Sequence, residues 1–311
     1  MDRRSLLLSL SLPTALSWTS AVAPLVATSA PMAAAASSAS SAVPRQIRYP
    51  LFGGQEDPFR RYCMEVLKLA LELCGVPYRM QPVPQPLGQG QAIRRLSSGQ
   101  GPVDILWSMT SEARERALLP LRIPLDRGLM GWRLLLVRRA DQQRFANIRS
   151  LDELAALTAG QMYDWPDTQI LQANGLKVGT GSAYASLFAM LERGRTDYFP
   201  RSVLEIEDDL ARFGAQHDLV IAPGLLLRYP TAFYFFVSPR EPRLADDLSR
   251  GMERALSEGS LQALFKQHMR QHSKRLDLHD RHVLALRNPL LPAATPLRRS
   301  ELWEEPGRWS S

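Results

Sequence analysis

Residues 103–114 have the sequence VDILWSMTSEAR, in which a run of apolar side chains gives way to a polar turn. Asp104 and Ser108 are the polar residues before Met109, so the run is typical of a strand buried in a parallel sheet. Arg114 lies just beyond the turn. Because open α/β sheets bind ligands beyond the carboxyl ends of their strands, this arrangement predicts a guanidinium group beside a ligand site.

A strand, a turn and a helix precede this run. Residues 45–51 alternate polar and apolar side chains, which predicts a strand. Two glycines at 53–54 favour a turn, and Asp57 before Pro58 predicts an N-cap and a first helical turn. The helix is expected to end at Gly75. This unit indicates an α/β architecture.

The alternation of strands and helices continues toward the C-terminus. Strands are predicted near 78–83, 131–137, 160–163, 176–179, 196–199, 219–222 and 232–237. Helices are predicted near 91–96, 166–173, 182–193, 202–213, 243–256 and 260–272. Two pairs have the spacing of a capping box and mark expected helix starts: Ser150 with Glu153, and Ser202 with Glu205. The predicted fold class is α/β.

The N-terminal residues have the layout of an export signal. Two arginines at 3–4 are followed by an apolar run at 6–12 and by small residues up to Ala36. Residues 1–36 are therefore expected to be a cleaved signal, and the Ser- and Ala-rich stretch 37–44 a linker. The arginine pair admits the twin-arginine route beside the general secretory route. The expected location is the periplasm.

The composition favours a globular protein without a nucleic-acid partner. The chain has 311 residues, of which 45% are apolar and 22% are charged, and its formal net charge is +7. Its 38 basic residues are interleaved with acidic ones and form no stripe with regularly spaced aromatic residues. The excess charge is therefore interpreted as a solvated basic surface.

The two cysteines are not expected to form a disulfide bond. Cys63 and Cys74 fall within one predicted helix. Their separation along the helix axis is roughly 16 Å. A disulfide requires Cα atoms within about 7 Å. Both residues are interpreted as small members of the core.

Three motifs have an ordinary structural explanation. His268 and His272 lie one helical turn apart, but no acidic residue completes a metal site on that face, so a solvated face explains them better. The Gly-Thr-Gly-Ser turn at 179–182 could cradle an anion, although a turn with a helix cap explains it more simply. Acidic residues at 205–209 favour a helix start. No metal, cofactor or hydrolase triad is expected.

Two arginines at strand ends are the sharper candidates for ligand binding. Arg114 follows the run described above, and Arg201 follows the predicted strand at 196–199. The planar guanidinium fork matches a carboxylate or a phosphate. Both side chains are therefore expected near a bound anion.

Five segments follow one another in an order that is found in a known family. They are a strand with its turn at 103–114, a segment at 123–137 that includes a crossover strand, a helix start at 150–154, a return strand at 233–237 and a closing helix at 261–265. In this order they resemble the type II periplasmic solute-binding proteins, specifically the family 3 group that binds polar amino acids. The likeness spans about residues 45–272.

The resemblance implies a two-lobed fold in which each lobe has a central, mostly parallel sheet flanked by helices. Residues 45–128 and 231–285 are expected to form the first lobe and 129–230 the second, with two crossover strands as a hinge. Residues 286–311 are expected to be an extended tail. The resemblance further implies a monomer that closes on a small molecule and serves an inner-membrane transporter or sensor.

The resemblance also implies which residues bind the ligand. In the family, an arginine after the first-lobe turn holds the ligand's carboxylate, and Arg114 matches that position. The other expected contacts are Trp107, Ser108 and Thr110 in the first lobe and Asp164, Trp165, Asp167, Thr168 and Arg201 in the second. Arg201 stands about where amino-acid binders place an acid for the ligand's ammonium group. An anionic or aromatic ligand is therefore considered beside an amino acid.

Two other functions compete with solute binding. An enzyme such as a dehydratase could use the same fold, and it would need a carboxylate in the cleft, for which Asp164, Asp167 and Glu56 are the candidates. An interaction module without a ligand, whose C-terminal tail binds a partner, is the third alternative. The chain is expected to bind a solute and not to be an enzyme.

Overall fold

The computed structural model describes residues 43–52, 58–85, 87–269, 276 and 278–304. The expected signal at 1–36 and most of the linker lie outside these residues, as do Glu56 and His272. Both lobes belong to the compact unit Ala42–Ser311. Within the described ranges, no helix is long and apolar enough to cross a bilayer.

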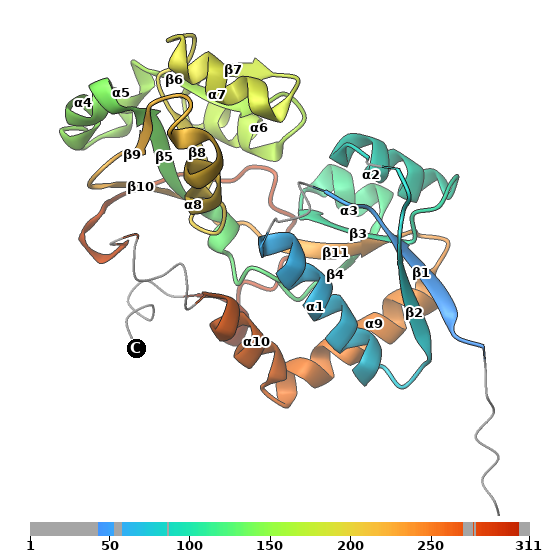
Figure 1. The fold of residues 1–311 in the computed structure, drawn as a ribbon. Coiled ribbons are helices and arrows are strands. Elements are labelled where there is room, and N and C mark those ends of the chain that lie inside the picture. Colours follow the sequence, from blue (N-terminus) through green and yellow to red (C-terminus); the bar gives the residue numbers. More distant parts are fainter. Residues whose placement is uncertain (1–42, 53–57, 86, 270–275, 277, 305–311) are drawn as a thin grey trace, which may run out of the picture. The chain divides into compact units, whose positions relative to one another are not determined.

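The first lobe combines N-terminal elements with a segment that returns later in the chain (Figure 1). Its strands are β1 (Arg45–Tyr49), β2 (Tyr78–Pro82), β3 (Ile105–Met109), β4 (Leu119–Leu121) and β11 (Phe233–Val237). Its helices are α1 (Pro58–Leu73), α2 (Gln89–Ser98), α3 (Glu112–Ala117), α9 (Pro242–Ser257) and α10 (Ser260–Met269). Strands β1 and β2 pair in parallel, whereas β11 lies between β3 and β4 and runs antiparallel to both.

Helices α1 and α9 lie side by side in the first lobe, as Figure 1 shows. One face of α1 buries Tyr62, Val66 and Ala70 in the core. The closest approach is at Gly251 of α9, where an added Cβ would lie 1.9 Å from Ala70 O. A glycine is therefore required for the two helices to pack at this distance.

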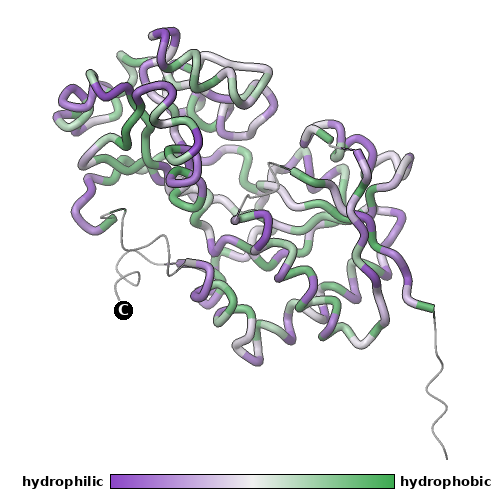
Figure 2. The backbone as a smooth tube through the Cα atoms, viewed as in Figure 1, coloured by the Kyte–Doolittle hydropathy of each residue, from purple (hydrophilic) through white to green (hydrophobic). Residues whose placement is uncertain are grey.

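The second lobe is organised around β5 (Trp132–Arg138), which is buried along most of its length and apolar between Arg133 and Arg138 (Figure 2). Its other strands are β6 (Thr158–Met162), β7 (Lys177–Gly181), β8 (Phe199–Ser202), β9 (Leu219–Ile221), β10 (Leu225–Arg228) and β12 (His282–Ala285). Its helices include α4 (Gln142–Ala146), α5 (Leu151–Ala155), α6 (Pro166–Ala173), α7 (Tyr184–Glu192) and α8 (Ile206–Asp209). Strand β5 pairs antiparallel with β8, β9 and β10.

The chain passes between the lobes through residues 122–131 and 229–232. The first of these segments leaves the first lobe and the second re-enters it, so the strands that flank them run in opposite directions. Strand β4 accordingly pairs antiparallel with β11, and β5 with β10. The connecting segments thus join the three-stranded sheet of β3, β11 and β4 to the five-stranded sheet that contains β5 and β10.

Asp126 joins the first connecting segment to the start of β11. Its carboxylate accepts N–H bonds from Met130 at 2.8 Å and from Phe233 at 3.2 Å. Burial raises the pKa of Asp126 to about 6. The segments also touch at Gly131, where an added Cβ would lie 2.0 Å from Tyr229 O. The hinge region is therefore closely packed.

The α/β class is confirmed, with a correction to strand orientation. Parallel pairing occurs between β1 and β2, between β6 and β7, and between β10 and β12. The pairings of β5 and β11 are antiparallel in the part of the chain that the structure describes. The expectation of mostly parallel sheets is thus wrong around these two strands. For the β5–β10 and β4–β11 pairs the reason is that the connecting segments run through the hinge in opposite directions.

Some local predictions are confirmed and others are corrected. Ser150 and Glu153 form the predicted capping box, and both cysteines are free. Ser202 does not cap a helix, because it is the last residue of β8 and pairs with Arg133 of β5. The helix predicted from Ser182 begins instead at Tyr184.

The C-terminal region also differs from expectation. Strand β12 pairs with β10 of the second lobe, so residues 282–285 do not lie with the first-lobe strands. The following residues are not extended throughout, since Ser300–Leu302 form a short 3-10 helix and Leu302 is buried. Arg127 of the first connecting segment binds Glu304 through an ion pair of 2.8 Å. Residues 302–304 therefore pack against the hinge region.

Candidate ligand-binding site

Residues of both lobes line a cavity of about 1080 Å³. The first-lobe wall comes from α1, the start of α2 and the ends of β3 and β11. The second-lobe wall comes from β5, β8, the start of α6 and the region of α8. Aromatic side chains lie on both sides, with Trp107 in the first lobe and Trp165 in the second. The cavity is therefore large enough for a small organic molecule.

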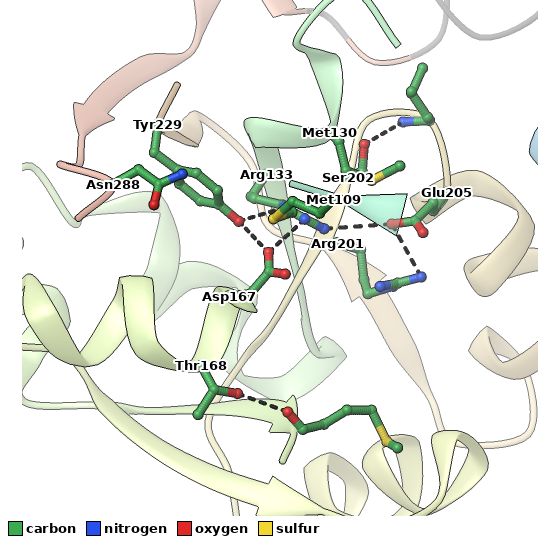
Figure 3. Close-up of polar contacts among 12 residues, drawn as sticks. Met109, Met130, Arg133, Asp167, Thr168, Arg201, Ser202, Glu205, Tyr229 and Asn288 are labelled. Atoms are coloured by element: carbon green, nitrogen blue, oxygen red, sulfur yellow. Dashed lines mark hydrogen bonds and ion pairs between the residues drawn. The ribbon is translucent and has the colours of Figure 1, made fainter. Parts of the chain in front are cut away.

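Arg133 of β5 anchors one group of charges in the second-lobe wall (Figure 3). Its Nη2 lies 2.5 Å from Asp167 Oδ1, and its Nε donates to the Tyr229 hydroxyl at 2.9 Å. The Tyr229 hydroxyl donates in turn to Asp167. Asp167 lies in the first turn of α6, directly after Pro166, where the helix dipole favours a negative charge.

Arg201 of β8 anchors the neighbouring group. Its Nε lies 2.6 Å from Asp209 Oδ2, and its Nη2 donates to the Tyr184 hydroxyl at 3.1 Å. The Tyr184 hydroxyl also donates to Asp209. Burial raises the pKa of Tyr184 well above its ordinary value, and burial does the same for Tyr229. Both phenols therefore stay neutral donors.

Glu205 links the two groups, as the dashed lines of Figure 3 show. Its Oε2 lies 3.5 Å from Arg133 Nη1 and 3.3 Å from Arg201 Nη2. Its side chain is 26% exposed and lines the cavity. Three carboxylates, those of Asp167, Glu205 and Asp209, thus oppose two guanidinium groups. The wall around Glu205 carries one net negative charge.

Arg114 is buried directly behind the first-lobe wall and is close enough to interact electrostatically with Asp164 and Asp167 of the cavity lining. Its Nη1 donates to Met109 O at 2.6 Å and its Nη2 donates to Gln89 Oε1 at 2.9 Å. Burial lowers the pKa of Arg114 to about 10, so the group is still a cation at neutral pH. Gln89 itself lines the cavity. Because its carbonyl oxygen binds Arg114, its amide nitrogen is left as a donor.

The structure brings some of the expected site residues together and not others. The residues that line the cavity are Trp107, Asp164, Trp165, Asp167 and Arg201. The residues that do not line it are Ser108, Thr110, Arg114 and Thr168. Ser108 is fully buried, Thr110 donates to Glu115 at 2.6 Å, and Thr168 donates to Met162 O at 2.8 Å. Of the two arginines expected at a bound anion, Arg201 thus lines the cavity, whereas Arg114 lies behind the lining.

Sequence reasoning missed Arg133, Glu205 and Arg94 as wall residues. Arg133 carries a signal that could have identified it, because it is the charged residue within the apolar run of β5 before Arg138. A charged side chain in a buried strand requires partners. Glu205 and Arg94 carry no such signal, since each lies in a stretch that mixes apolar and charged residues, as an amphipathic helix does.

Comparisons with solved structures identify the fold. An ancestral arginine-binding protein bound to arginine has a TM-score of 0.53 at 14% identity, over 72% of this chain and 97% of that one. An ancestral amino acid-binding protein, described as a precursor of cyclohexadienyl dehydratase, has a TM-score of 0.52 at 15% identity, over 71% and 94% of the two chains. A structure from work on glutathione import through GshT and a cystine importer of Streptococcus mutans has a TM-score of 0.53 at 15% identity, over 73% and 95%.

No protein-family model matches the sequence, and no curated protein matches it. At 14–15% identity, the structural matches above establish the fold. The chain has the two-lobed fold of these structures, and the expectation of a two-lobed fold is confirmed. The two lobes around the cavity are the lobes of this fold.

Proposed function

We propose that this chain is an extracytoplasmic solute-binding protein that captures a small amino-acid-like or anionic molecule by hinge closure. The observation that carries the proposal is the opposite charge of the two cavity walls. Among the described residues, the first-lobe wall contains Arg60 and Arg94 and no carboxylate. The second-lobe wall contains Arg133, Arg201 and Arg212 against Asp164, Asp167, Glu205, Asp208 and Asp209, which leaves two net negative charges.

Such walls suit a molecule that has an anionic end and a cationic end. The anionic end would lie toward Arg94 and the amide nitrogen of Gln89, both of which are donors. The cationic end would lie toward the partly exposed carboxylate of Glu205. A ligand that contacts both lobes binds the closed state more tightly than the open one and therefore favours closure.

The biological setting of the proposal is transport or sensing. Residues 1–36 would direct the chain to the periplasm, and an inner-membrane transporter or sensor would receive the loaded form. The glutathione import described for the Streptococcus mutans structure supports a role of this kind. The protein would act as a monomer and without a cofactor.

A thermal-shift screen of the chain without residues 1–36 tests the proposal. The panel contains amino acids, small carboxylic acids and small aromatic compounds. A ligand at 100 times its Kd stabilises the native state by about 2.7 kcal/mol, which raises the melting temperature measurably. Zwitterionic compounds are expected to give the largest shifts. If no compound with a carboxylate raises the melting temperature, the proposal is wrong.

A lyase is the second candidate function. It is favoured by Asp164, which lines the cavity and whose buried Oδ1 has no hydrogen-bond partner among the described residues. A carboxylate with spare acceptor capacity beside open volume can act as a general base. Following each screening hit by proton NMR for a day in the presence of the protein distinguishes the two functions, because a binding protein leaves the compound unchanged.

A further inference from the structure

Three aromatic rings surround the guanidinium group of Arg201. Its central carbon lies 5.1 Å from the ring centroid of Trp165, 5.2 Å from that of Phe199 and 5.3 Å from that of Tyr184. The rings of Trp165 and Phe199 are nearly parallel, with 22° between their planes. At these distances an aromatic ring face attracts a cation. The rings therefore form a cage for a planar cation.

Carboxylates complete the cage on its polar side. Asp209 lies 2.6 Å from Nε of Arg201, and Glu205 lies 3.3 Å from Nη2. Aromatic faces combined with carboxylate acceptors satisfy the requirements of a guanidinium group. The cage opens toward the cavity, because Trp165, Tyr184 and Glu205 all line it. A protein that recognised a guanidinium ligand in this wall would need these same groups.

We propose that Arg201 determines which ligands the protein accepts. Its own side chain fills the guanidinium cage and thereby occupies the place of a ligand's guanidinium group (we call it the internal guest). The proposal rests on the proposed solute-binding function, which it deepens. Arg201 reaches the cage from β8, and 5% of its side chain is exposed. Its role is to exclude ligands that carry a guanidinium group, and not to bind the anionic group of the ligand.

The exclusion follows from electrostatics. A ligand guanidinium could enter the cage only by displacing Arg201, which would leave a second cation in the same buried wall. Separating Arg201 from Asp209 would also leave a buried charge without its partner, which is strongly unfavourable. Solutes that carry a guanidinium group are therefore rejected at this wall, whereas the cationic end of a shorter solute can still approach Glu205.

Chemical rescue of Arg201→Ala tests the presence of the cage. The substitution removes the guest and leaves room for methylguanidinium, which is smaller than the side chain that is lost. We expect methylguanidinium at millimolar concentrations to raise the melting temperature of the variant by roughly 3 °C or more. Methylurea, its neutral isostere, should give no rise. The wild type and the control Arg79→Ala, which removes an exposed arginine of β2, should respond to neither compound.

A second variant keeps the test decisive if Arg201→Ala is poorly folded. Arg201→Ala combined with Asp209→Asn removes the unpaired carboxylate and should fold without help, but it should lose the response to methylguanidinium. Refolding of the single variant in methylguanidinium is then the readout, compared with refolding in methylurea. An equal yield or an equal melting temperature in the two compounds would overturn the proposal.

Ligand preference tests the exclusion itself. L-Arginine and L-citrulline have nearly the same shape and differ in whether the terminal group is a guanidinium or a urea. Calorimetric titration should show that Arg201→Ala gains at least about tenfold in preference for L-arginine over L-citrulline relative to the wild type. If the wild type already prefers L-arginine as strongly as the variant does, Arg201 excludes nothing.

The two proposals can fail separately. Methylguanidinium rescue needs no natural ligand. A failed rescue would therefore contradict the proposal that Arg201 fills a guanidinium cage, and the thermal-shift screen would still decide whether the protein binds a solute. A successful rescue together with a screen that finds no ligand would support the guanidinium cage and contradict the proposed solute-binding function.

Discussion

Arg133 Nη2 and Asp167 Oδ1 lie 2.5 Å apart in the wall of the cavity, with both side chains almost fully buried. The pair joins the central strand β5 to the first turn of α6. Since each charge has lost its water, each depends on the other. The first prediction follows from this dependence.

Asp167→Ala should lower the free energy of unfolding by about 3–5 kcal/mol, because it leaves the Arg133 cation buried without its closest partner. Urea denaturation at neutral pH measures the change. The control is Glu258→Gln, which removes one partner of the exposed Arg254–Glu258 pair and should change stability by less than about 1 kcal/mol. Equal losses in the two variants would contradict a buried, mutually dependent pair.

Arg94→Ala should weaken binding of a carboxylate-bearing screening hit by about tenfold or more, because it removes a charged donor from the first-lobe wall. Arg94 is exposed on α2, so the melting temperature of the free protein should change little. Calorimetry measures the affinity. Arg95→Ala is the matched control, since the next residue of the same helix does not line the cavity. Similar losses in both variants would indicate a general effect of charge.

Asp126 should make stability depend on pH between about 4 and 6. Burial raises its pKa from 3.8 to about 6, so the folded state holds the proton more tightly than the unfolded chain does. Its contribution is therefore present below pH 4 and is lost as pH rises through 6. The neighbouring Tyr62 and Tyr234 have raised pKa values and stay neutral over this range.

The measurement is the difference in unfolding free energy between the wild type and Asp126→Asn at pH 4, 5, 6 and 7. The wild type should lose roughly 3 kcal/mol relative to the variant as pH rises across this range. Contributions of other carboxyl groups cancel in the difference. A difference that is flat with pH would show that Asp126 titrates normally.

Trp303 should fasten the C-terminal segment to the hinge region. Its ring lies where an added Cβ on Gly128 would come within 2.8 Å, and its Nε1 donates to Pro296 O at 2.9 Å. Trp303→Ala should therefore lower the free energy of unfolding by about 2–4 kcal/mol. Leu297→Ala is the control from the same segment, because Leu297 is exposed and should contribute little. Trypsin cleavage after Arg298 or Arg299 should also become faster in the Trp303 variant.

Features that depend on near neighbours could be predicted from the sequence. The apolar run at 105–109 forms β3, and Pro166–Ala173 forms α6 with the predicted bounds. The capping box of Ser150 and Glu153 forms because both partners lie within one helical turn. The order of such elements was enough to indicate the two-lobed fold.

The directions of the charged side chains were decided by the tertiary structure. Ser202 and Glu205 have the spacing of a capping box, but Ser202 pairs with Arg133 in the register of β5 and β8, and the sheet prevails. Arg114 lies at the predicted strand end, yet its guanidinium group binds Met109 O and Gln89. Arg94, and not Arg114, lines the cavity. A carbonyl or carboxylate that is distant in sequence sets the orientation of a long cationic side chain. Only the folded chain brings those partners within reach of it.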